Sequence, residues 1–188
     1  MEKIRKLIHI AGIFTIIIAE MLGTLFLSSI ILCITTLYLI SEYLRLRGRS
    51  LPIVTRMTGL AARGEESSGW ILGPVSYAAG IVIAIDLFPK PINYVAISAL
   101  TLADGFASLV GTRFGHHGLP HNRKKTVEGS TSFFIISLLA ALIFVNPVAA
   151  LLGSIVGTAT ESLPMKSSEN LLIPITVGFS IRILLLLV

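Results

Sequence analysis

Long apolar runs, each closed by proline, glycine or charged residues, constrain this chain more than any other feature. The runs are about 17 to 22 residues long, the length that an α-helix needs to cross roughly 30 Å of hydrocarbon. Of the 188 residues, 54% are hydrophobic and the mean hydropathy is +0.87, which is too apolar for a soluble domain. The sequence shows none of the short alternating strands of a transmembrane barrel. It therefore predicts an all-α, polytopic membrane helix bundle, with a single domain over residues 1–188.

Seven apolar segments are expected to form transmembrane helices. Their expected ranges are Ile4 to Ala19, Met21 to Leu44, Gly69 to Phe88, Ile92 to Phe114, Thr131 to Val145, Pro147 to Ser162, and Leu171 to Val188. With this count, all of the 15 Lys and Arg residues except Lys90 and Arg182 fall on one side of the membrane. Because basic residues concentrate in cytoplasmic loops, the N-terminus is predicted to be cytoplasmic and the C-terminus to lie outside.

Charge and cysteine usage exclude several other functions. The net charge of +5 follows the sorting expected of a membrane protein, so nucleic acid is not an expected partner. Cys33 is the only cysteine, which excludes an intrachain disulfide or a cysteine-based metal site. The basic N-terminus has no small-residue cleavage site before the next apolar run, so the first helix is expected to be retained.

The stretch from Ala103 to Ser132 has the most unusual composition. It begins with Asp104 inside an apolar segment, where a lone carboxylate costs roughly 2.5 to 3.5 kcal/mol and therefore implies a partner, a metal or a function. A loop rich in glycine and basic residues follows, with Gly111, Arg113, Gly115, Gly118, Arg123, Lys124 and Lys125. Glycines leave backbone N–H groups accessible, and cationic side chains bind phosphate oxygens. The stretch predicts an acid that faces a phosphate-binding loop.

Helical spacing places further polar residues near this acid. Thr101, Asp104, Ser108 and Gly111 fall on one face of the segment from Ile92 to Phe114. Glu161, Glu42 and His9 come from three other predicted helices and are expected at the same depth, near the cytoplasmic side. The helix after the basic loop is expected to direct its free N–H groups and positive dipole end at a bound anion, with Thr126 or Ser130 as its cap.

Each of these signals also has a simpler explanation. A carboxylate that only forms a hydrogen bond between helices would also explain Asp104. A loop that only sets the membrane topology and contacts lipid head groups would explain the basic residues. A solvated position at a helix end explains Glu161 as well as a functional role does. A position at the membrane interface, without a catalytic role, explains His9. The spacing of His116, His117 and His121 does not specify metal geometry, so a solvated loop is favoured there.

The central motif consists of Asp104-Gly105-Phe106-Ala107, Gly111, Arg113-Phe114-Gly115, Leu119-Pro120, Asn122, Lys124-Lys125-Thr126 and Glu128-Gly129-Ser130. It resembles the signature of the phytol, dolichol and polyprenol kinases, which are membrane enzymes that use CTP to phosphorylate a lipid alcohol and are related to the CDP-lipid synthases. Similar flanking motifs are Arg5-Lys6 with His9 and Gly12, and Glu161-Ser162-Leu163-Pro164 with Asn170 and Pro174. Weaker similarities lie at Glu42 with Arg45 and at Glu66 with Ser68-Gly69. The chain departs from the family at Ser168-Glu169, where two aspartates are common.

The resemblance implies a lipid kinase domain that transfers the γ-phosphate of CTP to an isoprenoid alcohol such as phytol, geranylgeraniol or a polyprenol. Asp104, His9 and Glu161 are the implied catalytic residues, with Asp104 and Glu161 as Mg²⁺ ligands and either Asp104 or His9 as the base. The implied phosphate-binding residues are Gly111, Arg113, Gly115, Asn122, Arg123, Lys124, Lys125, Thr126, Gly129 and Ser130. Glu42, Glu128 and Asn170 are implied in supporting roles.

Two other functions are compatible with the same residues. A CDP-lipid synthase would attack the α-phosphate of CTP on a similar loop, and an ion-coupled transporter would also carry intramembrane acids. A transporter predicts polar residues that continue to the outer face and often an internal repeat, neither of which the sequence shows. The expected partners of the kinase are a nucleotide, the lipid alcohol and membrane lipids. Small residues at Gly153 and Gly157 would suit packing within the chain or in a homodimer.

Overall fold

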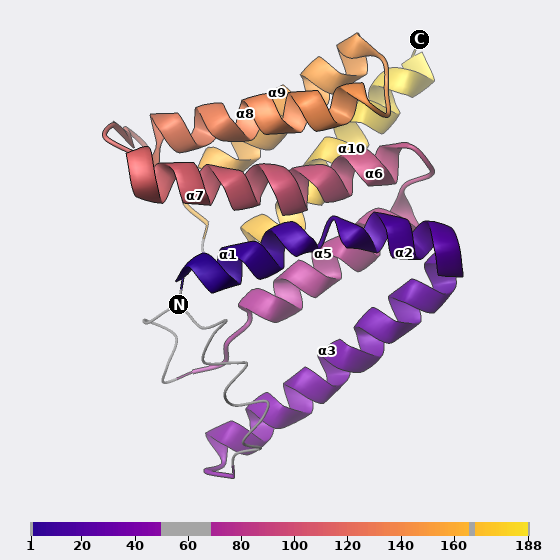
Figure 1. Cartoon of the computed structure of the whole chain (residues 1–188), viewed down its shortest axis with the longest axis vertical. Helices are drawn as coiled ribbons and strands as arrows, with labels where there is room; N and C mark the ends of the chain where they lie inside the picture. The colour runs from indigo at the N-terminus through magenta and orange to yellow at the C-terminus, as the bar shows by residue number, and fades with distance from the viewer. Residues whose placement is uncertain (1, 50–68, 166–167, 188) are drawn as a thin grey trace.

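The computed structural model describes residues 2–49, 69–165 and 168–187, which are mostly helical (Figure 1). The helices are α1 (Glu2–Ala11), α2 (Phe14–Leu22), α3 (Thr24–Leu46), α5 (Gly73–Leu87), α6 (Ile92–Ser98), the π-helical turn η2 (Ala99–Ala103), α7 (Asp104–Phe114), α8 (Val127–Leu142), α9 (Pro147–Ser162) and α10 (Glu169–Leu187). Two short strands, β1 (Gly118–Leu119) and β2 (Asn122–Thr126), pair antiparallel between α7 and α8. The fold is thus a mostly helical bundle, as predicted, with one small hairpin that the sequence analysis did not predict.

The first predicted helix is broken into α1 and α2 at Gly12. A side chain on Gly12 would overlap the Tyr77 hydroxyl and come within 2.9 Å of Thr101 Cγ2, so glycine lets α1 lie directly against α5 and η2. The turn into α3 falls at Gly23, which has φ of 88°, rather than near Glu20 as predicted. Glycine adopts this left-handed conformation without the steric cost that other residues would meet.

Gly12→Ala should therefore destabilise the protein, by about 1 to 3 kcal/mol, because the added methyl group overpacks a closed interface. The expected measurement is a lower melting temperature in detergent. Gly73→Ala is the matched control, since a Cβ at Gly73 meets nothing within 4 Å. Equal melting temperatures for the two variants would contradict the close approach of α1 to Tyr77.

One continuous helical rod runs from Ile92 to Phe114, as predicted, but it contains the π-helical turn η2 directly before Asp104. The Asp104 N–H donates to Ala99 O, one residue further back than in an α-helix. Leu100 O accepts a hydrogen bond from His9 Nε2 at 2.8 Å. The regular α-helical spacing that was predicted from the sequence is therefore interrupted directly before Asp104.

The hairpin leads directly into α8. The Thr126 side chain caps this helix by accepting from Gly129 N at 3.2 Å, which confirms Thr126 as the cap. The helix consequently begins at Val127 and not at Thr131. Pairing between β1 and β2 also occupies backbone groups in the loop that the sequence left without secondary structure.

The helices pack in a bundle in which α8 lies between α7 and α9, and α10 contacts α9, α5 and α6 (Figure 1). The helix α3 lies at the edge of the bundle, against α5 and α2, and exposes many large apolar side chains. Among the described residues, three segments are long and apolar enough to cross a membrane, namely Thr24–Leu46, Ile92–Phe114 and Glu169–Leu187. Gly73–Leu87 and Val127–Leu142 are shorter apolar helices. Membrane association follows from these segments, while seven spans remain a prediction.

Candidate active site

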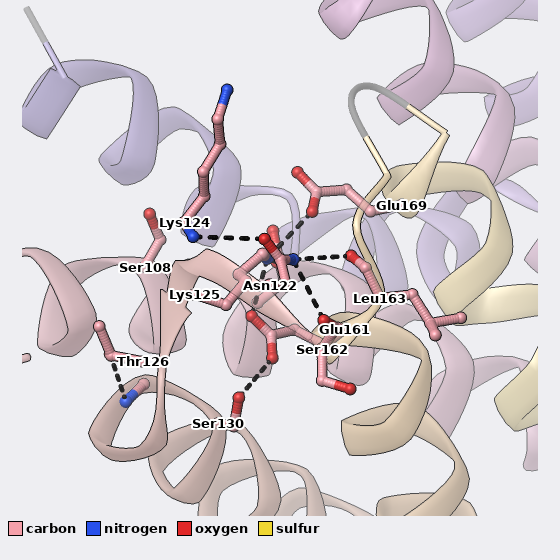
Figure 2. A network of polar contacts seen from close by, with 12 residues as sticks. Ser108, Asn122, Lys124, Lys125, Thr126, Ser130, Glu161, Ser162, Leu163 and Glu169 are labelled. Atoms are coloured by element: carbon pink, nitrogen blue, oxygen red, sulfur yellow. Dashed lines mark hydrogen bonds and ion pairs between the residues drawn. The ribbon is translucent and has the colours of Figure 1, made fainter. Parts of the chain in front are cut away.

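The Lys125 ammonium lies among three carboxylates from three different helices. Its Nζ atom is 2.7 Å from Glu161 Oε1, 3.0 Å from Glu169 Oε2 and 4.0 Å from Asp104 Oδ1. Asp104 begins α7, Glu161 lies in the last turn of α9, and Glu169 begins α10, so the cluster forms where these three helices meet the hairpin. Figure 2 shows Lys125, Glu161 and Glu169 of this cluster. The three acids are only 3%, 2% and 5% exposed. Asp104 and Glu161, which are far apart in the sequence, therefore meet around one cation.

Buried charges in this cluster balance one another. Burial alone would lower the pKa of Lys125, but the negative charges of Asp104, Glu169 and Glu161 raise it and outweigh burial. Lys125 is therefore a permanent cation in this environment. Pairing of this kind offsets the cost of removing each charge from water, and the loss of any one partner leaves the others poorly compensated.

His9 holds the second oxygen of Asp104. Its Nε2 atom lies 3.1 Å from Asp104 Oδ2 and 2.8 Å from Leu100 O, and both are acceptors. Nε2 therefore carries a proton, and Nδ1 is the only ring nitrogen with a free lone pair when the imidazole is neutral. Tyr77 fixes the histidine, since its hydroxyl donates to His9 O at 2.6 Å and its ring centroid lies 4.2 Å from that of the imidazole. His9 is thus placed to orient the carboxylate.

Hydrogen bonds attach the hairpin and α8 to the end of α9. Ser130 Oγ donates to Glu161 Oε2 at 2.9 Å, which occupies the oxygen that does not face Lys125. Asn122 Nδ2 donates to Ser162 O at 3.1 Å and to Leu163 O at 3.0 Å (Figure 2). These bonds set the position of β2, and with it the position of Lys125.

The other predicted phosphate-binding cations lie outside the carboxylate cluster. Arg113, Arg123 and Lys124 are exposed. The Arg113 guanidinium stacks at 5.3 Å on the Phe114 ring, and the Lys124 side chain extends away from Glu161 and Glu169 in Figure 2. The structure thus separates Lys125, which is partly buried among the acids, from the exposed cations Arg113, Arg123 and Lys124, which are accessible to an anion from solvent.

The predicted loop glycines pack around the side chain of Thr126. A Cβ on Gly111 would lie 3.0 Å from Thr126 Oγ1, and a Cβ on Gly129 would lie 3.1 Å from it. At Gly115 a Cβ would lie 2.6 Å from Thr126 Cγ2. The N–H of Gly115 donates to Gly111 O at 3.1 Å, and that of Gly129 donates to the threonine. Close packing of α7 against the start of α8 therefore explains these glycines, and their contact with phosphate stays a prediction.

The three residues predicted in supporting roles bond elsewhere. Glu42 accepts from Arg45 Nη2 at 2.5 Å and from Ile71 N at 2.9 Å, so it joins α3 to the segment before α5, and both of these bonds lie outside the Lys125 cluster. Glu128 pairs with His117 Nδ1 at 2.7 Å. Asn170 Nδ2 donates to Ser76 Oγ at 3.2 Å. The predicted positions at Glu66 and Ser68 lie outside the described residues.

Two residues that were not predicted as site members lie in the cluster. Glu169 contacts Lys125 directly, and Lys6 is 7% exposed with Asp104, Glu169 and Lys125 as its charged neighbours. The sequence contained a pattern that could have identified both residues. Lys6 is three residues before His9, on the same face of α1, and Glu169 lies two residues before the last apolar run, next to Asn170.

The donor set of the cluster suits a hard cation. Carboxylate oxygens are the ligands that Mg²⁺ prefers in proteins, and Asp104 and Glu161 supply them. Among residues 2–49, 69–165 and 168–187, no three His, Cys, Asp or Glu side chains are arranged to enclose a metal ion. The acids face the Lys125 ammonium, which takes the place of a cation between them.

Curated relatives of the chain are lipid kinases by name. Probable phytol kinase 2, chloroplastic, of Glycine max is 31% identical over 141 residues, which are 72% of this chain and 43% of that protein. Farnesol kinase, chloroplastic, of Arabidopsis thaliana is 31% identical over 122 residues, 55% of this chain and 40% of that protein. CTP-dependent diacylglycerol kinase 1 of Eremothecium gossypii is 29% identical over 89 residues, 47% of this chain and 28% of that protein. The matched regions cover less than half of each relative. No family model and no solved structure matches the chain.

Proposed function

This chain belongs to the phytol and polyprenol kinase family, and we propose that it transfers the γ-phosphate of CTP to the hydroxyl of an isoprenoid lipid alcohol. The proposal rests on the cluster in which Lys125 lies close to Asp104, Glu161 and Glu169, beside exposed basic residues. Phosphoryl transfer depends mainly on positioning and on charge neutralisation, and this arrangement supplies both. CTP as donor is supported by the name of the diacylglycerol kinase relative.

The proposed reaction forms a bond between the alcohol oxygen and the γ-phosphorus and breaks the bond between that phosphorus and the β-phosphate oxygen, so CDP leaves. Lys125 stabilises negative charge on the transferred group from the buried side, and Arg123 and Lys124 bind the remaining phosphates from the exposed side. The hydroxyl proton passes to Asp104, whose other oxygen is held by the protonated Nε2 of His9.

A metal ion would be held by Asp104 and Glu161 in this scheme and would neutralise charge on the phosphate oxygens. Glu161 is oriented for this by Ser130, which donates to one of its oxygens. The sorting of basic residues supports a site on the cytoplasmic side, to which the alcohol has access from the bilayer.

The test uses purified protein in lipid nanodiscs with CTP labelled at either the α- or the γ-phosphate. Phytol, farnesol, geranylgeraniol, a polyprenol and diacylglycerol are offered as acceptors, and unlabelled UTP and ATP are offered as competing donors. A kinase places the γ-label in a lipid phosphate and releases CDP. Phosphatidic acid is offered as a lipid phosphate acceptor in parallel, and transfer of the α-label to it with release of pyrophosphate would identify a CDP-lipid synthase instead. An absence of label in all lipid products would reject both.

A further inference from the structure

Glu169 is a buried acid for which the proposed reaction has no direct use. It is 5% exposed, it lies in the first turn of α10, and its Oε2 atom is 3.0 Å from Lys125 Nζ. We propose that Glu169 is a positioning residue, which holds the Lys125 ammonium in the site so that its charge faces the transferred phosphate. This role rests on the proposed function.

The other two acids are engaged and leave Lys125 incompletely fixed. Glu161 divides its oxygens between Lys125 and Ser130, so only Oε1 faces the ammonium. Asp104 Oδ1 is 4.0 Å from Nζ, beyond hydrogen-bond distance, and Oδ2 is occupied by His9. A lysine side chain has four rotatable carbon bonds, and one close contact does not define its direction. The ion pair with Glu169 supplies a second close electrostatic contact for the ammonium.

Glu169 is itself held in place by its neighbour. Asn170 Nδ2 donates to Gly73 O at 3.4 Å and to Ser76 Oγ at 3.2 Å, which attaches the first turn of α10 to the first turn of α5. The backbone packs there as well, because a Cβ on Gly80 would overlap Asn170 O. A carboxylate in the first turn also interacts favourably with the positive end of the helix dipole. The position of Glu169 is therefore set by α5 and α10 and not by the flexible lysine.

The test is a double-mutant cycle of Glu169→Gln and Lys125→Gln. In the otherwise unchanged protein, E169Q should lower kcat/KM for the nucleotide by roughly 10- to 100-fold, the scale of loss from a misplaced group. In the K125Q background the same change should cost less than about 3-fold, because the group that Glu169 positions is already absent. Equal losses in both backgrounds, or no loss in E169Q, would overturn the proposal.

Melting temperatures of the nucleotide-free variants provide a readout independent of activity. E169Q should lower the melting temperature clearly when Lys125 is present, and by much less in the K125Q background, where Lys6 is still a charged neighbour of Glu169 but the ion pair with Lys125 is absent. Equal changes in both backgrounds would overturn the pairing. An inactive parent protein in which the two changes differ would reject the proposed kinase function alone and leave the Lys125–Glu169 pairing supported.

Two further variants complete the design. Glu169→Asp keeps the carboxylate and should recover most of the activity lost in E169Q, so an E169D enzyme as slow as E169Q would contradict the positioning role. Glu20→Gln is the control for loss of an exposed glutamate–lysine pair, since Glu20 is ion-paired with Lys90 at the solvent-exposed surface, outside the Lys125 cluster. If K125Q alone does not fold while the double variant does, that recovery is itself the expected coupling.

Discussion

Asp104→Asn should lower kcat/KM for lipid phosphorylation by about 10²- to 10⁴-fold, the contribution of a positioned acid or base. The substitution keeps the size of the side chain and removes its charge. An amide cannot accept the hydroxyl proton, and it no longer balances the positive charge of the Lys125 ammonium. The measurement is steady-state transfer of the γ-label to lipid, with insertion and folding checked by size-exclusion chromatography and melting temperature.

Asp86→Asn is the control for this experiment. Asp86 is also an aspartate within an apolar helix, α5, but its Oδ1 accepts from Ser28 Oγ at 2.9 Å and belongs to no part of the proposed site. Activity of D86N should stay within about 2-fold of the parent protein, since surface polar changes away from a site have small effects. A folded D104N protein with unchanged kcat/KM would contradict the proposed mechanism, in which Asp104 accepts the hydroxyl proton.

Glu161→Gln is expected to reduce both activity and stability. Glutamine still accepts from Ser130 Oγ, so the hydrogen bond to α8 is retained while the charge that faces Lys125 is lost. Breaking one member of a buried ion-pair network costs about 3 to 5 kcal/mol, and we expect a smaller loss here because Glu169 stays beside Lys125. Activity should fall by at least about 100-fold, as expected for a lost charge at the transferred phosphate.

Thermal unfolding in detergent and transfer of the γ-label measure these two effects. A melting temperature equal to that of Glu20→Gln, the control for loss of an exposed glutamate–lysine pair, would contradict the buried pairing of Glu161 with Lys125. Retained activity together with a lower melting temperature would show that Glu161 only stabilises the fold. The two readouts therefore separate a catalytic role from a structural one.

Local patterns in the sequence predicted much of the helical framework. The rod from Ile92 to Phe114 and the helix from Pro147 to Ser162 have the predicted bounds, because proline, glycine and apolar periodicity act on neighbouring residues. The capping role of Thr126 was also predicted, since a threonine placed before a helix bonds to a backbone N–H three residues later.

The errors arose where distant contacts override local preference. The break at Gly12 depends on Tyr77, a residue of α5 that lies beside it only in the folded chain. The hairpin from Gly118 to Thr126 forms in a loop with little strand propensity, where Asn122 bonds to the end of α9. The π-helical turn before Asp104 coincides with a hydrogen bond from His9. None of these partners is close in sequence.

The sequence by itself determined that the chain is an apolar helical protein, and it predicts that the basic residues lie on one side of the membrane and that Asp104 and the basic loop after it carry the chemistry. Hydrophobicity, charge and helix caps are properties of short segments, so they can be read without coordinates. Only the tertiary structure decided which charges meet. It placed Lys125 among Asp104, Glu161 and Glu169 rather than with the exposed cations, and it directed Glu42 to Arg45. The reason is that a buried charge must be compensated by whichever groups packing brings within a few ångströms, and that depends on how the helices pack.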